Sequence, residues 1–319
     1  MMHAILIAED QSLVWSEVPD PVPADGEVVI DVHAAALNRA DLMQRAGDYP
    51  PPPGWPEWMG LEVAGVVGHA PEDSRFHVGD KVCALLGGGG YAERVAVPAG
   101  MVLPVPEGLT MVQAAAIPEA FATSYLNLCL EGGLKAGDTV LIQAGASGLG
   151  MAAIQLVKTL GGTVMTTVST EEKAAFVRSL GADIVINRTT DDLAAAMGEH
   201  PVDIALDCIG GPDLGRCVEK MAAGGRWIVI ATMGGARTEL DMNLFFRRGL
   251  RLIGSTLRSR TPEMKAEVLV GLERVLWSAF SAGTIKPVIH AMLPMTRAEE
   301  AHAILQRREN LGKVVLTNP

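Results

Sequence analysis

Short apolar runs alternate with amphipathic stretches along the chain from residue 138 onward. The apolar runs cover residues 139–144, 163–168, 183–187, 203–208 and 226–231, and helical patterns lie between them near 149–160, 171–180, 191–197 and 213–222. A further run, RLIGST at 251–256, supplies a sixth strand. Strands separated by helices pair in parallel, because a parallel connection needs a crossover. The pattern therefore predicts an α/β fold with a doubly wound parallel sheet, covered by helices on both faces.

The first 120 or so residues have a different pattern. Runs rich in Val, Ile and Ala, such as 27–37 and 62–68, are interrupted by the turn-forming segments PDPVPADG and YPPPPGWP. This predicts a β-rich, loop-heavy half. After a helix near 263–282, the tail is strand-like at 286–295, helical at 297–308 and strand-like again at 312–317. We expect this tail to return to the N-terminal domain.

Composition narrows the possible partners. The chain has 319 residues, of which 49% are hydrophobic and 20% charged, and this length is typical of about two domains. A formal net charge of −11 argues against nucleic acid or an anionic membrane as the main partner. The four cysteines show no two-residue spacing, and no apolar stretch approaches the length of a membrane span. We expect a cytoplasmic protein.

The segment IQAGASGLGMAAIQ, residues 142–155, places Gly145, Gly148 and Gly150 between a strand and a helix. Glycine permits a tight turn and a close backbone approach, and the free amides of a helix N-terminus attract negative charge. The spacing GxxGxG departs from GxGxxG, and a tight turn alone is the competing interpretation. The succession of strands favours a dinucleotide site. The residues expected to hold its pyrophosphate are Gly145, Ala146, Ser147, Gly148, Leu149 and Gly150.

The end of the second strand indicates which dinucleotide binds. An NAD site usually carries an acidic residue roughly 20 positions beyond the glycines, but this strand ends in TVST, residues 167–170. Lys173 follows and, with Ser169 or Thr170, offers partners for a 2′-phosphate, although Glu171 and Glu172 oppose that interpretation. The pattern favours NADPH over NADH.

Several segments together resemble the medium-chain dehydrogenase/reductase superfamily, and within it the zinc-independent quinone oxidoreductases. They are ALNRADLMQRAGDYPPPPG, GLEVAG, IPEAFATSYLNL, AGASGLGMAAIQL, DCIGG and LRSR. The resemblance implies a GroES-like catalytic domain at 1–122, completed by 264–319, and a Rossmann NADPH-binding domain at 123–263. It also implies an active site in the cleft between the domains, and a homodimer joined through the sixth strand.

Zinc ligands of the superfamily's alcohol dehydrogenases are missing at the matching positions. Their zinc uses a Cys early in the first domain, a His in a Gly-His-Glu motif and a Cys or acid near the domain junction. Here the segments read LNRAD, Gly60-Leu61-Glu62 and IPEAFATS, and Leu61 cannot ligate a metal. The seven histidines are scattered singly. We expect no metal.

The resemblance also assigns site residues. Asn38 matches an active-site asparagine, for which loop capping is the alternative, and Tyr49 matches a tyrosine at the cleft, for which packing is the alternative. Where relatives carry a second tyrosine, this chain has Met43. The remaining cofactor contacts implied by the resemblance are Thr123, Tyr125, Gly210, Met233, Gly234, Arg258 and Ser259.

The predicted reaction is hydride delivery from NADPH to a quinone, with solvent supplying the final proton and no metal involved. Transfer of single electrons is equally compatible with the sequence. Two alternatives stay open. The protein is an NADPH-dependent enone or enoyl reductase, or it is a non-catalytic NADPH-binding sensor.

Overall fold

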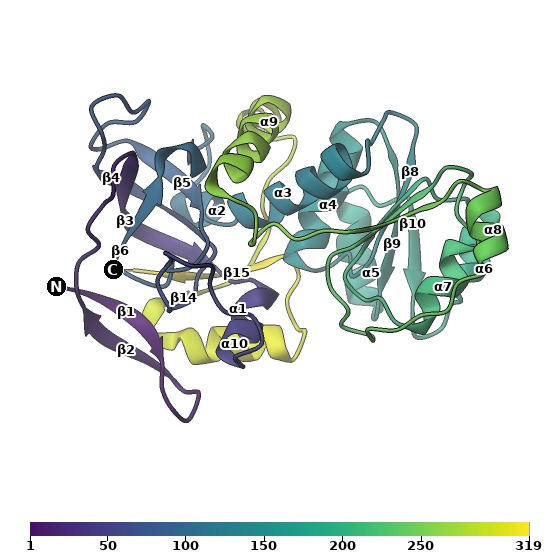
Figure 1. Ribbon diagram of the computed structural model, residues 1–319, viewed down its shortest axis with the longest axis horizontal. Coiled ribbons are helices and arrows are strands. Elements are labelled where there is room, and N and C mark those ends of the chain that lie inside the picture. Colours follow the sequence, from purple (N-terminus) through teal and green to yellow (C-terminus); the bar gives the residue numbers. More distant parts are fainter. Residues whose placement is uncertain (319) are drawn as a thin grey trace. The chain divides into compact units, whose positions relative to one another are not determined.

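The computed structural model describes residues 1–318, which fold into two compact units. The first unit contains Met1–Ala122 and the chain from Leu257 onward, and the second contains Thr123–Thr256 (Figure 1). From the sequence, the chain was predicted to return to the first unit at residue 264. The structure already groups Leu257 with that unit, and the Arg258 guanidinium hydrogen bonds to three of its residues.

The second unit is built on a parallel sheet in the order β10-β9-β8-β11-β12-β13. Its strands are β8 (Thr139–Ile142), β9 (Thr163–Val168), β10 (Ile184–Asn187), β11 (Ile204–Asp207), β12 (Arg226–Val229) and β13 (Arg251–Gly254). Its helices are η2 (Leu126–Glu131), α4 (Gly148–Thr159), α5 (Glu171–Ser179), α6 (Leu193–Glu199), α7 (Pro212–Val218) and α8 (Met242–Arg247). The order reverses between β8 and β11, which makes their carboxyl ends the switch point where ligands bind in such sheets.

The sheet of the second unit is held by an apolar core and one buried carboxylate. Leu141, Met165 and Trp227 are fully buried. The indole of Trp227 donates to Asp207 Oδ2 at 2.9 Å, and Asp207 Oδ1 accepts from the backbone amides of Ile209 and Gly210. Asp207 therefore ties the end of β11 to both the core and the following loop.

The first unit contains a seven-stranded sheet and a separate two-stranded one. The larger sheet follows the path β14-β15-β3-β4-β5-β7, with β6 also paired to β3. Its strands are β3 (Glu27–Ala36), β4 (Glu62–His69), β5 (Lys81–Leu85), β6 (Arg94–Pro98), β7 (Val102–Pro104), β14 (Ile289–Pro294) and β15 (Lys313–Thr317). The small sheet pairs β1 (Met2–Ile7) with β2 (Leu13–Val18). Because β15 lies between β14 and β3, the C-terminal tail completes the larger sheet.

Helices of the first unit follow or cover these strands. They are α1 (Arg39–Arg45), η1 (Ala99–Met101), α2 (Met111–Ala114), α3 (Pro118–Tyr125), α9 (Pro262–Ser281), η3 (Met295–Arg297) and α10 (Ala298–Gln306), and the second unit begins within α3, at Thr123. The fold class predicted from the sequence is confirmed. The short helices α1, α2, α3 and α8 were not predicted, because a few residues carry too little periodicity to detect. Within residues 1–318, none of the helices combines the length and the apolar character needed to cross a membrane.

Candidate active site

The first unit contains a buried ion pair between the first residues of two strands. Lys313, which opens β15, places its Nζ 2.6 Å from Glu62 Oε1 at the start of β4, and both side chains are almost completely buried. Lys313 Nζ also donates to the Leu37 carbonyl at 2.6 Å and to Asn38 Oδ1 at 2.8 Å. All three ammonium hydrogens therefore have acceptors, which a buried lysine requires.

Asn38 is a central member of this network. Its amide donates to Glu62 Oε1 at 3.0 Å and to the Ala36 carbonyl at 3.3 Å, while its backbone N–H donates to Asp41 Oδ2 at 2.7 Å. The structure thus places Asn38 at the start of α1, with both amide hydrogens directed to acceptors in the first unit. Its contact with nicotinamide or substrate stays a prediction.

Asp41, Tyr91 and His302 extend the network into the core. The Tyr91 hydroxyl donates to Asp41 Oδ2 at 3.0 Å and lies 3.4 Å from His302 Nε2. Burial raises the pKa of Asp41 to about 6 and lowers the pKa of His302 to about 4. The imidazole is therefore neutral at physiological pH. Sequence reasoning missed all three, because only the fold brings residues so far apart in the chain together.

The structure brings two of the predicted site residues together, Tyr49 and Arg258. The guanidinium of Arg258 is buried and donates to the carbonyls of Gly87 at 2.9 Å and Tyr49 at 2.7 Å, and to Gln44 Oε1 at 2.6 Å. Its Cζ also lies 4.8 Å from the centre of the Tyr49 ring. Burial raises the pKa of the half-buried Tyr49 phenol. The cofactor contact of Arg258, and that of the exposed Ser259, stay predictions.

Glu119 lies beside the ion pair, in the first turn of α3. Its backbone N–H donates to Glu62 Oε2 at 2.8 Å. Burial, followed by the nearby charge of Glu62, raises the pKa of the Glu119 carboxyl to about 8. The carboxyl is therefore mostly protonated at neutral pH. From the sequence, IPEAFATS was used for the resemblance, for the missing metal ligand and for Thr123, and Glu119 was not singled out.

Leu61, which occupies the position of the zinc-binding histidine of alcohol dehydrogenases, is part of the core. Leu61 is only 1% exposed, and its carbonyl accepts from the Leu86 amide at 2.8 Å. Within the described residues, 1–318, no group of three His, Cys, Asp or Glu side chains is arranged to hold a metal ion.

In the second unit, the glycine-rich segment joins β8 to α4. Ser147 caps the helix, because its Oγ accepts from the Gly150 amide at 3.0 Å. A Cβ at Gly150 would lie 2.4 Å from the Gly145 carbonyl oxygen, and one at Gly145 would lie 2.1 Å from Thr166 Oγ1. These two glycines are therefore required for the close packing of strand and helix.

The amides of Gly148 and Leu149 occupy the first turn of α4. In residues 1–318 neither has a hydrogen-bond acceptor, since the first N–H groups of a helix lack partners within it. Both residues are partly exposed, and the helix dipole adds positive potential there. The junction fits the pyrophosphate of a dinucleotide, with these amides and the Ser147 hydroxyl as donors.

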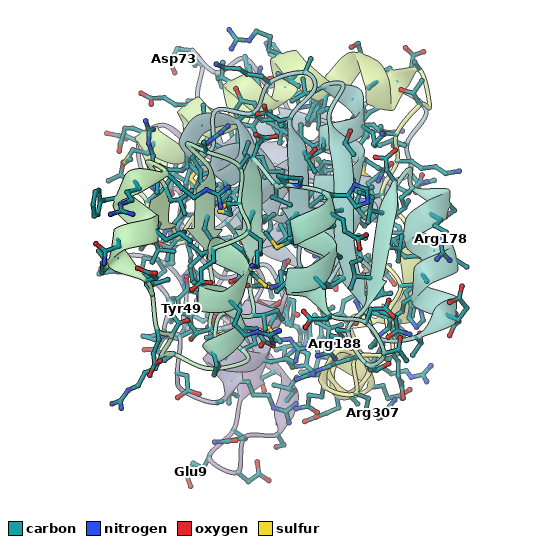
Figure 2. All side chains as sticks on the ribbon, turned by 90° about the vertical axis from the view of Figure 1, so that its right-hand side faces the viewer. Glu9, Tyr49, Asp73, Arg178, Arg188 and Arg307 are labelled. Carbon is teal, nitrogen blue, oxygen red and sulfur yellow. The ribbon has the colours of Figure 1, made fainter. Side chains whose placement is uncertain are left out.

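The end of β9 continues directly into the capped start of α5. Thr170 caps that helix through a 3.2 Å bond from the Lys173 amide, so Ser169 and Lys173 lie on either side of the cap. Glu171, one of the two acids that oppose a phosphate here, is bound at 2.9 Å by Arg178, which Figure 2 shows on the outer edge of α5. This pairing reduces the repulsion that Glu171 would exert on a 2′-phosphate.

The loops after β11 and β12 pack backbone against backbone. Gly210 forms a bridge with Gly235, and a Cβ at Gly211 would lie 2.8 Å from the Gly234 carbonyl oxygen. This packing accounts for the glycines, and the contacts of Gly210 and Gly234 with a cofactor stay predictions. So does that of Met233, which is 43% exposed on the same loop.

Thr123 and Tyr125 lie where the chain enters the second unit. The Thr123 carbonyl accepts from the Asn127 amide at 2.7 Å, and Tyr125 is buried. The structure gives both a local role in the helix, and their predicted cofactor contacts are not tested by it.

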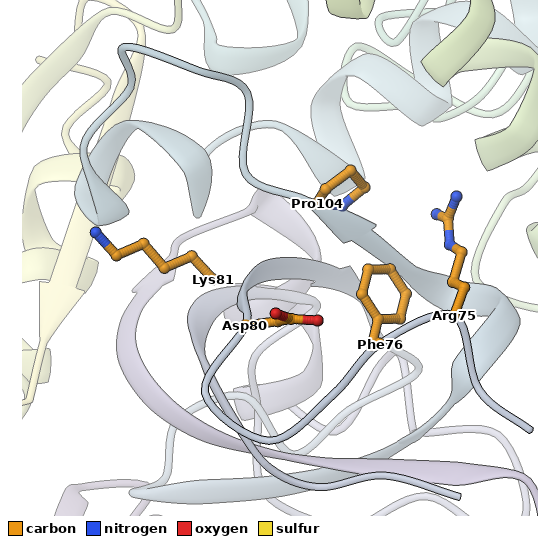
Figure 3. Close-up of a pocket in the computed structure, with 5 residues that line it drawn as sticks. All are labelled: Arg75, Phe76, Asp80, Lys81 and Pro104. Atoms are coloured by element: carbon orange, nitrogen blue, oxygen red, sulfur yellow. The ribbon is translucent and has the colours of Figure 1, made fainter. Parts of the chain in front are cut away.

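A hollow of about 340 Å³ lies elsewhere on the first unit (Figure 3). Its lining residues are Arg75, Phe76, Asp80, Lys81 and Pro104. The Arg75 guanidinium is bound to Glu273 and to the Val102 carbonyl, both at 3.0 Å. None of the predicted site residues lines this hollow.

The fold and site define a class of protein. A doubly wound parallel sheet with open amides at its first strand–helix junction, together with a separate β-rich unit holding a buried polar network, is typical of a nicotinamide-dependent dehydrogenase or reductase. Comparisons with known proteins identify the family. Residues 24–107 match the alcohol dehydrogenase GroES-like domain, and residues 148–272 match the family described as zinc-binding dehydrogenase.

Relatives match nearly the whole chain. A quinone oxidoreductase of Sus scrofa is 32% identical over 308 residues, covering 94% of this chain and 92% of the relative. The quinone oxidoreductase of Thermus thermophilus, solved also in complex with NADPH, is 33% identical with a TM-score of 0.82, covering 99% of this chain and 100% of that one. The chain therefore belongs to the medium-chain dehydrogenase/reductase superfamily, as a quinone-oxidoreductase-like oxidoreductase. The family and the enzyme class predicted from the sequence are confirmed.

The same fold occurs in the CurK enoyl reductase, which is 23% identical with a TM-score of 0.85 and covers 100% of this chain and 99% of its own. At that identity the comparison shows the fold alone.

Proposed function

We propose that the protein is an NADPH-dependent reductase that delivers hydride, or single electrons, to quinones without a metal. NADPH binding is supported by one observation above all. Within residues 1–318, the backbone amides of Gly148 and Leu149 at the start of α4 donate no hydrogen bond within the protein. The choice of a quinone as the molecule that is reduced is supported by the quinone oxidoreductases among the full-length relatives, one of them solved with NADPH.

Preference for NADPH over NADH is supported by the end of β9. No acidic side chain follows the strand at the position that binds a 2′-hydroxyl, and Ser169 and Lys173 lie beside the capped N-terminus of α5. Glu172 is the acid that remains against a phosphate here, since Glu171 is paired with Arg178. We therefore expect Lys173→Ala to weaken NADPH binding and to leave NADH binding nearly unchanged.

The reduced nicotinamide, when bound, supplies a hydride to the acceptor. The protein's own residues hold and orient the two partners: the α4 amides bind the pyrophosphate, and Tyr49 contacts the acceptor through its ring or phenol. A quinone spreads the charge that it gains into an aromatic system, so positioning and modest hydrogen bonding are sufficient. The proton that completes the product comes from solvent.

Action without zinc is supported by the core position of Leu61. A histidine there would be the expected ligand, and Leu61 instead packs at 1% exposure. We expect a chelator to leave the activity unchanged.

A homodimer through β13 is part of the same proposal. Among the described residues this strand pairs only with β12, and its Leu252 is 43% exposed. We also propose a cytoplasmic location, since none of the four cysteines forms a disulfide within residues 1–318.

The test is a steady-state assay of NADPH oxidation with an ortho-quinone, a para-quinone and a simple enone, repeated with NADH and with a chelator. The proposal expects fast, chelator-insensitive oxidation of NADPH by a quinone and much slower oxidation of NADH. If only the enone is reduced, the protein is an enone reductase and the quinone part of the proposal is wrong. Cofactor binding without any turnover would instead favour a sensor.

A further inference from the structure

Lys265, in the first turns of α9, is a buried lysine without an acceptor. Its side chain is only 1% exposed, yet within residues 1–318 no oxygen lies within hydrogen-bond or ion-pair distance of its Nζ. The ammonium instead lies 5.7 Å from the centre of the Trp55 ring. The other almost fully buried lysine, Lys313, has three acceptors. A buried ammonium without an acceptor is costly, and a ligand that supplies an oxygen to it would offset that cost.

Lys265 belongs to a cluster that also contains Tyr49, Trp55, Glu119 and Arg258, which we call the acceptor cluster. Arg258 connects the loop that carries Tyr49 with the loop that carries Gly87, because it donates to the carbonyls of both residues. The Trp55 ring packs against Gly87. A Cβ at Gly87 would lie 2.6 Å from that ring. Tyr49, Trp55 and Glu119 are partly exposed, so the cluster reaches the surface at these three side chains.

The charges within the cluster leave Lys265 without a full counterion. Burial lowers the pKa of Lys265, and the nearby Glu119 opposes that shift. Burial also raises the pKa of Glu119 to about 8, so this carboxyl is mostly neutral at physiological pH. Arg258 adds a second positive charge nearby, and its own donors are directed to Gly87, Tyr49 and Gln44. The cluster therefore has a net positive charge, with Arg258 beside the Tyr49 ring and Lys265 beside the Trp55 ring.

We propose that Lys265 binds the acceptor oxygen that becomes negatively charged on reduction, with Trp55 and Tyr49 as the aromatic walls for a planar conjugated molecule. This rests on the proposed quinone reduction. In that step the acceptor gains a hydride, one of its carbonyl oxygens becomes an oxyanion, and the oxyanion then takes a proton from solvent. The ammonium of Lys265 keeps its own protons and stabilises the charge as it develops.

The first test compares Lys265→Met with the wild-type enzyme. Methionine keeps the length and apolar packing of the side chain and removes the charge. Removing one stabilising donor from an oxyanion typically lowers kcat by roughly 10²-fold or more, so we expect a loss of about that size in kcat with a quinone. The KM for NADPH stays unchanged. Lys265→Arg restores part of the activity, and Lys81→Met, which removes an exposed lysine of the same unit, has no effect.

A kcat for Lys265→Met within about twofold of the wild-type value would overturn the proposal. A fall in activity together with lost NADPH binding would also overturn it, since a general disturbance of the fold would then explain the result.

The second test needs no turnover and separates this proposal from the proposed function. The probe is para-nitrophenolate, a planar aromatic anion whose visible absorbance reports its protonation state. We expect the wild-type protein to bind it and to favour the phenolate form, and Lys265→Met to lose at least about tenfold in affinity, as for a lost charge-assisted hydrogen bond. Equal binding of para-nitrophenolate by both proteins, or no binding by the wild type, would overturn the proposal that Lys265 binds an anion. If the phenolate binds through Lys265 but no quinone is reduced, the proposed function fails and the anion site remains.

Discussion

At the scale of single residues, the two buried lysines of the first unit differ in how their charge is compensated. Lys313 has a carboxylate, a carbonyl and an amide oxygen around its ammonium, all within 2.8 Å. Such a pair is expected to be sensitive to the loss of one partner, because the remaining charge stays buried without compensation. Lys265 lacks that shell within residues 1–318, and we assign its charge to a ligand.

Lys313→Met should destabilise the protein by about 3 to 5 kcal/mol, the typical result of leaving a buried charge without its partner. Urea unfolding provides the measurement, and adding Glu62→Gln should restore part of the loss. Arg307→Met, which breaks an exposed pair with Glu309, serves as the control and should change little. If the urea midpoint of Lys313→Met equals that of the wild type, the buried ion pair does not contribute to stability in this way.

Glu119 makes the free energy of unfolding depend on pH. The pKa of its carboxyl is raised from 4.5 to about 8 by burial and by Glu62, so between these values the folded state binds more protons than the unfolded state. Stability contributed by this group is therefore full below about pH 4.5 and falls as the pH rises toward 8.

Replacing Glu119 by glutamine removes this titration. We expect Glu119→Gln to gain stability relative to the wild type as the pH rises from about 5 to 9, by about 4 kcal/mol in total. Urea unfolding at several pH values measures the difference, and the exposed Glu107→Gln change is the control. A difference that stays constant with pH would show that Glu119 is ionised in the folded protein.

At the scale of elements, the β8–α4 junction combines two requirements. Gly145 and Gly150 allow strand and helix to approach closely, and the Gly148 and Leu149 amides remain open for an anion. The packing requirement holds without a ligand, so it is testable on the protein alone.

Gly150→Ala should destabilise the protein by about 1 to 3 kcal/mol, because its Cβ would lie 2.4 Å from the Gly145 carbonyl oxygen. It should also weaken NADPH binding, since relief of the clash moves the amides of α4. Gly198→Ala in α6 is the matched control: nothing lies within 4 Å of its Cβ, and alanine favours a helix by about 0.5 to 1 kcal/mol. Thermal unfolding with and without NADPH measures both effects. Equal responses of the two variants would contradict this account of the junction.

At the scale of the whole molecule, the local sequence pattern was sufficient for the Rossmann-type sheet. Its first four strands are compact apolar runs, each followed by a helical pattern, so the order of elements from Thr139 to Val218 follows from neighbours in the sequence. The short helix α8 before the last strand was not predicted. The glycine junction was predictable for the same reason, because strand, turn and helix are contiguous there.

The polar network of the first unit was not predictable in this way. Lys313 meets Glu62 and Asn38 only because β15 inserts between β14 and β3, a pairing of segments from opposite ends of the chain. Lys265 likewise lies far in sequence from Trp55 and Glu119. Asn38 and Tyr49 were found through resemblance, while their partners became visible only in the folded unit.

The most direct test of the central claim is a single-turnover measurement on the intact protein. The enzyme is loaded with one equivalent of NADPH, mixed rapidly with a para-quinone in the presence of a chelator, and followed through the absorbance of the reduced nicotinamide. We expect this absorbance to disappear in one phase, and more slowly when the transferred hydrogen at C4 is deuterium. Retention of the absorbance with NADPH bound and quinone in excess would contradict a zinc-independent NADPH:quinone reductase.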